Sequence, residues 1–197
     1  MKIDDSWIMN TSETVQAECR GLGFSRLAES RWSPRGYDGR PIADDTLRVI
    51  FEAARSAQSS YNEQPWRFLV AAPGSPLRAE LEACLDAGNA FAAGAWILGL
   101  AAAKRTFSKD GRTNRHAAFD TGAACQMLAL QAFASGLGTR FMAGFDGARA
   151  AALCPADCEP IAFFAIGHPS AEALEKKPAR RRKALGELVS GQVWAAV

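Results

Sequence analysis

Polar side chains with a capacity for chemistry gather first in the segment S-R-W-S-P-R-G-Y. Arg31, Ser33 and Arg35 alternate there, so an extended chain would project two guanidinium groups and a hydroxyl to one side. Guanidinium forks match phosphate oxygens, and a hydroxyl adds a short neutral donor. The pattern therefore suits a phosphate-bearing ligand, although a solvated arginine loop would have the same composition.

A second cluster, residues 59–66 (SSYNEQPW), packs hydroxyl and amide groups into a short segment. Asn62 and Gln64 each carry a donor and an acceptor, as recognition of the polar edge of a pyrimidine-like ring requires. The alternative is a structural turn in which Ser and Asn cap the chain and Trp66 fills the core.

The third cluster is KKPARRRK at residues 176–183, with six basic residues in eight. It contains no aromatic residue for base stacking, and the whole chain has a net charge of only +2, so nucleic-acid binding is the least favoured role. The segment is either a solvated tail or the source of arginines that complete the phosphate site.

Composition narrows the remaining classes of protein. The 197 residues, 48% hydrophobic and 22% charged, predict one globular domain. An acidic N-terminus without an apolar run argues against a signal peptide, and the charge-free stretches 87–103 and 121–139 are too short or too polar to span a membrane. Five scattered cysteines and two histidines, without zinc-site spacing, favour a reducing cytoplasm and no bound metal.

Hydrophobic periodicity predicts the elements that position these clusters. We expect helices over 44–57, 75–86, 120–138 and 146–153, strands over 66–72, 96–102, 139–145 and 160–167, a loop over 25–43 and a long polar connection over 104–119. Asp44 or Asp45 would cap the first of these helices and Asp120 the third. The pattern alone suggests a doubly wound α/β fold, but the chain has no G-x-G-x-x-G, phosphate-loop or G-x-S-x-G motif.

Taken together and in order, the motifs resemble those of the FMN-dependent nitroreductase family, over roughly residues 25–190. The matching segments are Arg31-Trp32-Ser33-Pro34-Arg35, Pro41-Ile42, Ser59-Ser60-Tyr61-Asn62-Glu63-Gln64-Pro65-Trp66, Asp120-Thr121-Gly122-Ala123-Ala124, Gly136-Leu137-Gly138-Thr139, Ile166-Gly167-His168-Pro169 and Arg182-Lys183-Ala184-Leu185. Each motif alone is weak, and the ordered set carries the resemblance.

The resemblance implies an α+β fold in place of the doubly wound one. A central mixed, largely antiparallel sheet would be flanked by helices, in an intertwined homodimer that binds FMN at the subunit interface. Residues 25–190 would form this domain, preceded by an N-terminal extension (1–24) and followed by a C-terminal tail (191–197).

The resemblance also implies which residues bind the cofactor. Arg31, Trp32 through its backbone, Ser33, Arg35, Arg180 and Arg182 would hold the phosphate and ribityl chain. Ser59, Ser60 and Asn62 would reach the same flavin from the partner subunit. The backbone of Ala143 and Gly144 would lie by the reactive edge of the ring, and Asn89 by its pyrimidine side.

Two positions depart from the family pattern. Gln58 replaces the usual proline before Ser59, which removes a rigid turn constraint. Ala143 stands where some members carry an acidic residue, which would alter the substrate pocket rather than flavin binding.

The implied activity is reduction of nitroaromatics, quinones or related small-molecule acceptors, with NAD(P)H as a transient reductant and no catalytic acid or base. Two alternatives stay open: another FMN chemistry on the same scaffold, such as dehalogenation or dehydrogenation of a metabolite, or a non-enzymatic FMN-binding dimer. The cations of 104–119 would either favour an anionic substrate or be solvated.

Overall fold

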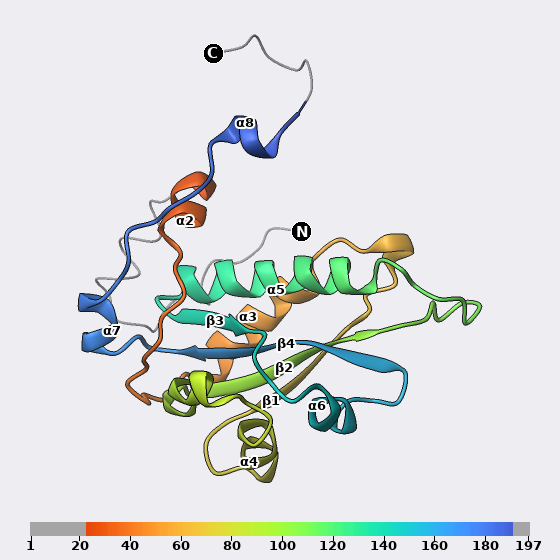
Figure 1. Ribbon diagram of the computed structural model, residues 1–197, viewed down its shortest axis with the longest axis horizontal. Coiled ribbons are helices and arrows are strands. Elements are labelled where there is room, and N and C mark those ends of the chain that lie inside the picture. The colour runs from red at the N-terminus through yellow and green to blue at the C-terminus, as the bar shows by residue number, and fades with distance from the viewer. Residues whose placement is uncertain (1–22, 191–197) are drawn as a thin grey trace.

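All four predicted strands form one antiparallel sheet in the computed structural model, which describes residues 23–190 (Figure 1). The strand order is β1-β2-β4-β3. The strands are β1 (Trp66–Ala71), β2 (Ile97–Lys104), β3 (Gly138–Met142) and β4 (Cys158–Gly167). Antiparallel pairing throughout rules out the doubly wound fold and confirms the α+β prediction.

Helices cover both faces of this sheet (Figure 1). They are α2 (Phe24–Ser30), α3 (Asp44–Arg55), α4 (Pro76–Glu82), α5 (Ala117–Ala134), α6 (Gly147–Leu153), α7 (Ala171–Glu175) and α8 (Leu185–Leu188), with 3-10 segments η2 (Ser60–Asn62) and η3 (Ala87–Gly94). Helices α3 and α5 pack on one face, and α4, η3 and α6 on the other.

Alternation along the central strands fills both cores. Ile97 and Ala101 of β2 face α3 and α5, whereas Leu98 and Leu100 face the opposite core. The strand can be read as a continuous apolar run because both of its faces are buried. Gly99 makes room for a neighbour, since a Cβ at this position would lie 2.3 Å from the Phe164 ring.

Three sequence-based predictions of local structure are corrected. The segment 25–43 is not all loop, because α2 occupies its first part. Helix α3 is capped at Ala43, and Asp44 and Asp45 lie in its first turn, where carboxylates favour the positive end of the helix dipole. Helix α5 begins three residues before Asp120, whose carboxylate accepts the backbone N–H of Ser60 at 3.0 Å instead of capping the helix.

The end of α5 follows the predicted glycine signal. Gly136 has a φ of +76°, and the N–H of Leu137 returns to the carbonyl of Ala132 at 2.9 Å. The chain then turns directly into β3, which places that strand at the C-terminal end of α5. Within residues 23–190 no helix is long and apolar enough to cross a bilayer, and no group of metal-binding side chains is present.

Candidate functional site

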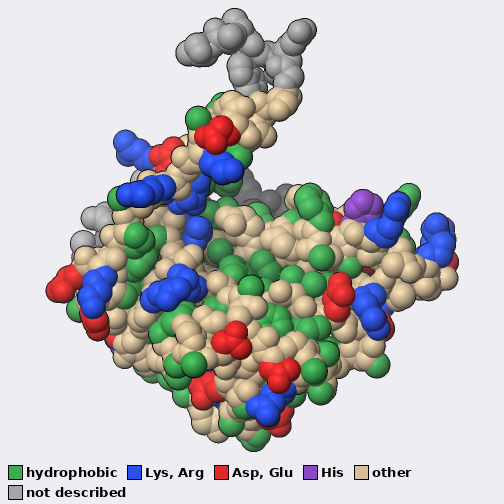
Figure 2. All heavy atoms as spheres, viewed as in Figure 1, with side chains coloured by type: hydrophobic (Ala, Val, Ile, Leu, Met, Phe, Trp, Pro, Cys, Tyr) green, Lys and Arg blue, Asp and Glu red, His purple; other side chains and the backbone are tan. Residues whose placement is uncertain are grey.

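The chain after α7 runs beside α2 (Figure 1), and Lys and Arg side chains gather on this part of the surface (Figure 2). Arg31, Arg180 and Arg182 line a hollow there. Arg31 donates from Nη1 to Oγ of Ser33 at 3.3 Å, and Arg180 donates from Nη1 to the backbone carbonyl of Arg31 at 2.9 Å. Burial, and then the nearby charges of Arg180 and Arg182, lower the pKa of Arg31. Of the residues that line this hollow, only Glu29 is acidic, so the arrangement suits a multiply charged anion.

Arg35 and Arg140 line an adjoining hollow of about 350 Å³ together with Trp32 and Ser33. Arg140 donates from Nη1 to the backbone carbonyl of Ser33 at 3.0 Å. Its guanidinium carbon lies 5.5 Å from the centre of the Phe91 ring, and that of Arg35 lies 5.8 Å from the same ring. Two cations therefore share one aromatic platform.

Asn89 and Gly144 meet at the next position along the surface. Asn89 donates from Nδ2 to the carbonyl of Gly144 at 2.8 Å, and the N–H of Asp86 donates to the same carbonyl at 3.2 Å. A Cβ at Gly144 would lie 2.7 Å from Oδ2 of Asp86, so a larger residue here would displace that carboxylate. The exposed residue Ala143 joins this corner to the end of β3.

These contacts form one continuous strip of side chains and backbone. From the amide end to the cationic end, the strip consists of Gly144, Asn89, Phe91, Arg140 with Arg35, Ser33, Arg31, Arg180 and Arg182. Trp32 lines both hollows, and Nζ of Lys177 lies 5.8 Å from the centre of its ring. The strip thus offers, in order, amide and backbone groups, an aromatic ring with two cations, a hydroxyl and three arginines.

The Ser59, Ser60 and Asn62 cluster forms a strained loop at η2. Tyr61, Asn62 and Gln64 all have positive φ, between 51° and 56°, a region that costs non-glycine residues energy. Ser59 Oγ accepts the N–H of Gln64 at 3.0 Å. With the bond from Ser60 to Asp120, this contact holds the loop in place of the proline that Gln58 replaces.

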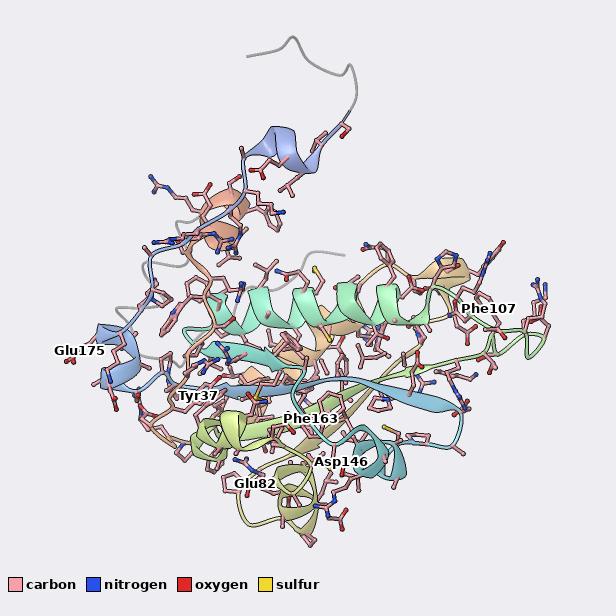
Figure 3. The ribbon with its side chains drawn as sticks, in the orientation of Figure 1. Tyr37, Glu82, Phe107, Asp146, Phe163 and Glu175 are labelled. Carbon is pink, nitrogen blue, oxygen red and sulfur yellow. The ribbon has the colours of Figure 1, made fainter. Side chains whose placement is uncertain are left out.

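This loop lies at the opposite end of the molecule from the strip. Ser60 is tied to the first turn of α5, whereas β3, which carries Arg140, follows the last turn of that helix. The 18 residues of α5 span about 27 Å at 1.5 Å per residue. Figure 3 shows the same separation: Phe107, which contacts Tyr61, lies at one end of the long axis, and Tyr37 and Glu175 lie at the other.

Nothing in the strip is a general acid, a general base or a nucleophile at neutral pH. Burial raises the pKa of Cys84, Cys154 and Cys158, and it raises that of Cys125 to about 12, so these thiols stay protonated. None of the four lies among the strip residues. The arrangement can bind and polarise a ligand, whose own chemistry must carry the reaction.

Comparison with known proteins gives the site its context. Residues 28–95 match the model of the nitroreductase family. A solved oxidoreductase containing FMN superposes on the chain with a TM-score of 0.80 and 27% identity, covering 100% of both chains. A protein from Desulfovibrio desulfuricans, described as a nitroreductase in complex with FMN, has a TM-score of 0.71 and 26% identity over 94% of this chain and 100% of its own. The chain belongs to the nitroreductase family.

A curated relative from Mycolicibacterium smegmatis extends the comparison. This uncharacterised 15.4 kDa protein, encoded in the ask 5' region, is 38% identical over 111 residues, which cover 53% of this chain and 74% of its own. Its description names no activity, so it adds sequence similarity without chemistry.

In this nitroreductase family member, the structure brings most of the predicted site residues together. Nine of them lie in or beside the strip: Arg31, Trp32, Ser33, Arg35, Asn89, Ala143, Gly144, Arg180 and Arg182. The other three, Ser59, Ser60 and Asn62, lie far from it in the same chain.

Sequence analysis missed three residues of the site: Asp86, Phe91 and Arg140. The signal for Arg140 was available, because it is the one charged residue in the otherwise uncharged segment 139–145. Phe91 and Asp86 gave no such signal, since their places depend on how η3 packs against the end of β3.

Proposed function

We propose that this chain binds FMN along the strip and uses it as an NAD(P)H-dependent oxidoreductase. The observation that carries the proposal is the order of groups along the strip. Amide and backbone groups suit the ring edge, the hydroxyl suits the sugar chain, and the arginines Arg31, Arg180 and Arg182 suit a terminal phosphate. FMN carries a ring, a sugar chain and a terminal phosphate in this same order.

The donor set supports the fit on physical grounds. Like charges held side by side are unfavourable, and no ion pair with a carboxylate offsets Arg31, Arg35, Arg140, Arg180 or Arg182 among residues 23–190. A phosphate dianion would supply the missing negative charge. The structures described as containing FMN share this fold, which adds a separate line of support.

FMN, when bound, supplies the capacity to accept a hydride from NAD(P)H and to pass two electrons to an oxidant such as a nitroaromatic or quinone. The protein's part is to hold and tune that group. Arg31, Arg180 and Arg182 anchor one end, and Asn89 with the backbone at Gly144 fixes the other. The side chains of the strip bind and orient the group and need to move no proton.

The visible spectrum of the purified protein tests this function. We expect absorbance bands of an oxidised flavin, release of FMN on denaturation, and loss of the bands when NAD(P)H is added without oxygen. Bound FMN that NAD(P)H does not reduce would favour one of the alternatives, a non-enzymatic binder or an FMN chemistry with another reductant. Failure to bind flavin after reconstitution would contradict the proposal.

We also propose that the active form is a homodimer. The strained loop with Ser59, Ser60 and Asn62 is built like a binding element, yet it lies at the far end of α5 from the strip. A second copy running in the opposite direction could place this loop against the first copy's strip.

Light scattering during size exclusion should give twice the 21.1 kDa mass of one chain. Asn62→Ala, which alters an exposed side chain, should weaken FMN binding without changing that mass. A flavin-loaded monomer would rule out the shared site.

The boundaries of the functional unit remain part of the proposal. We assign FMN binding to residues 25–190 of a cytoplasmic enzyme. The predicted extension (1–24) and tail (191–197) lie almost wholly outside the described residues.

A further inference from the structure

Arg140 is the one charged residue of strand β3. Its Nη1 is tied to the carbonyl of Ser33, but its Nε is buried and has no hydrogen-bond partner among residues 23–190. A buried donor without a partner is costly in a folded protein, and such exceptions call for an explanation. The side chain also lines the adjoining hollow, so a ligand there would meet the guanidinium through its other nitrogens.

Arg35 makes the position of Arg140 more unusual. Both guanidiniums lie within 6 Å of the Phe91 ring centre, and burial, then the charge of Arg35, lowers the pKa of Arg140. Glu172, the one carboxylate that lines this hollow, is already paired with Lys176 at 2.6 Å. The two arginines therefore concentrate positive charge without a counter-ion from the described chain.

Arg140 lies at the boundary between the phosphate cluster and the Phe91 ring. It lines the hollow of Arg31, Arg180 and Arg182 and also the adjoining hollow that it shares with Arg35. On the other side, Phe91 is two residues from Asn89 in η3. Arg140 thus lies between the part of the strip assigned to the ring and the part assigned to the phosphate.

We propose that Arg140 is a further cofactor-binding residue, which acts with Arg35 to place positive charge against the pyrimidine side of the flavin ring. This inference rests on the proposed function. FMN, when bound, would take up a hydride, that is two electrons and one proton, from NAD(P)H and would thereby gain negative charge. Fixed cations beside that charge stabilise the reduced cofactor more than the oxidised one.

The test compares Arg140→Met with wild type in three measurements: the Kd for FMN, the Kd for riboflavin, and the midpoint potential of bound FMN. Methionine keeps an unbranched chain that can still pack on Phe91 but removes the charge. Riboflavin has the same ring as FMN but lacks the phosphate. If Arg140 contacts the ring, its replacement should weaken the binding of FMN and of riboflavin equally, by about three- to tenfold. A tenfold loss of preference for reduced FMN corresponds to a midpoint potential about 30 mV more negative.

Matched variants separate charge from structure. Arg140→Lys keeps the charge, so it should retain most of the wild-type midpoint potential of bound FMN. Arg140→Gln removes the charge but keeps a donor toward Ser33, so this variant tests the charge even if the methionine variant does not fold. Arg48→Met, at an exposed position in α3, should leave all three values unchanged.

The possible failures are distinguishable. Weaker FMN binding with unchanged riboflavin binding would assign Arg140 to the phosphate and overturn the inference. An unchanged midpoint potential in folded Arg140→Met and Arg140→Gln proteins would reduce Arg140 to a structural residue. If wild-type protein binds neither flavin, the proposed function itself fails, and this inference fails with it.

Discussion

Replacing Arg78 by methionine is expected to lower the free energy of unfolding by about 3–5 kcal/mol, because each buried carbonyl that loses its donor costs about 1–3 kcal/mol. Arg78 lies in α4 and is only 4% exposed. Its Nε donates to Oε1 of Glu82 at 2.6 Å. Its two Nη atoms donate to five backbone carbonyls: those of Ala71, Ala92, Ala93, Ala95 and Trp96.

The carbonyls that Arg78 binds connect this effect to the site. Ala92 and Ala93 lie in η3, the 3-10 segment that also carries Asn89 and Phe91. A 3-10 segment of eight residues has poor internal hydrogen bonding and needs outside support. Without the guanidinium, η3 should loosen, so amide hydrogen exchange over 87–95 should become faster and FMN binding weaker.

Arg55→Met provides the matched control for Arg78. Arg55 pairs with Glu52 at 2.7 Å, close to the 2.6 Å of the Arg78 pair, but both side chains of the Arg55 pair are exposed. An exposed pair contributes about 0–1 kcal/mol, so urea unfolding should barely change for this variant. Equal, small effects in both variants would show that the Arg78 contacts do not support η3.

Arg78 also marks where prediction from sequence stopped. The strands could be located to within two or three residues because Trp66–Ala71, Ile97–Lys104 and Cys158–Gly167 are short apolar runs between turn signals. Nothing in the sequence separates Arg78 from an ordinary solvated arginine on a helix. Its role appears only when five carbonyls, from the end of β1 and from the stretch 92–96, converge on it.

In the candidate site, too, some residues could be predicted from the sequence and others could not. The residues of the ordered motifs, from Arg31 to Arg182, could be carried over by family resemblance, and nine of them lie in or beside the strip. The start of α5 could not be predicted, because Asp120 has the residue type of a helix cap but serves the η2 loop. Arg140 acquires its place only through its contacts with Ser33 and Phe91, which are distant in sequence.

Removing either Arg31 or Arg182 is the second change with a large expected effect. A hydrogen bond to a charged group contributes about 1.5–3 kcal/mol, so Arg31→Ala or Arg182→Ala should weaken FMN binding roughly ten- to a hundredfold. This loss of affinity can be measured by titrating the apoprotein with FMN and monitoring the quenching of flavin fluorescence. Folding should be little affected by Arg182→Ala, because that side chain is exposed.

The ligand and the control variant make this prediction specific to the phosphate. Riboflavin should bind wild type and both variants with similar affinity, in contrast to Arg140→Met, which should weaken both flavins. Arg26→Ala, an exposed position in α2 close to Arg31, should change neither affinity. Because three arginines share one anion, the double variant should lose less than the product of the two single losses. Unchanged FMN affinity in both single variants would remove Arg31 and Arg182 from the phosphate site.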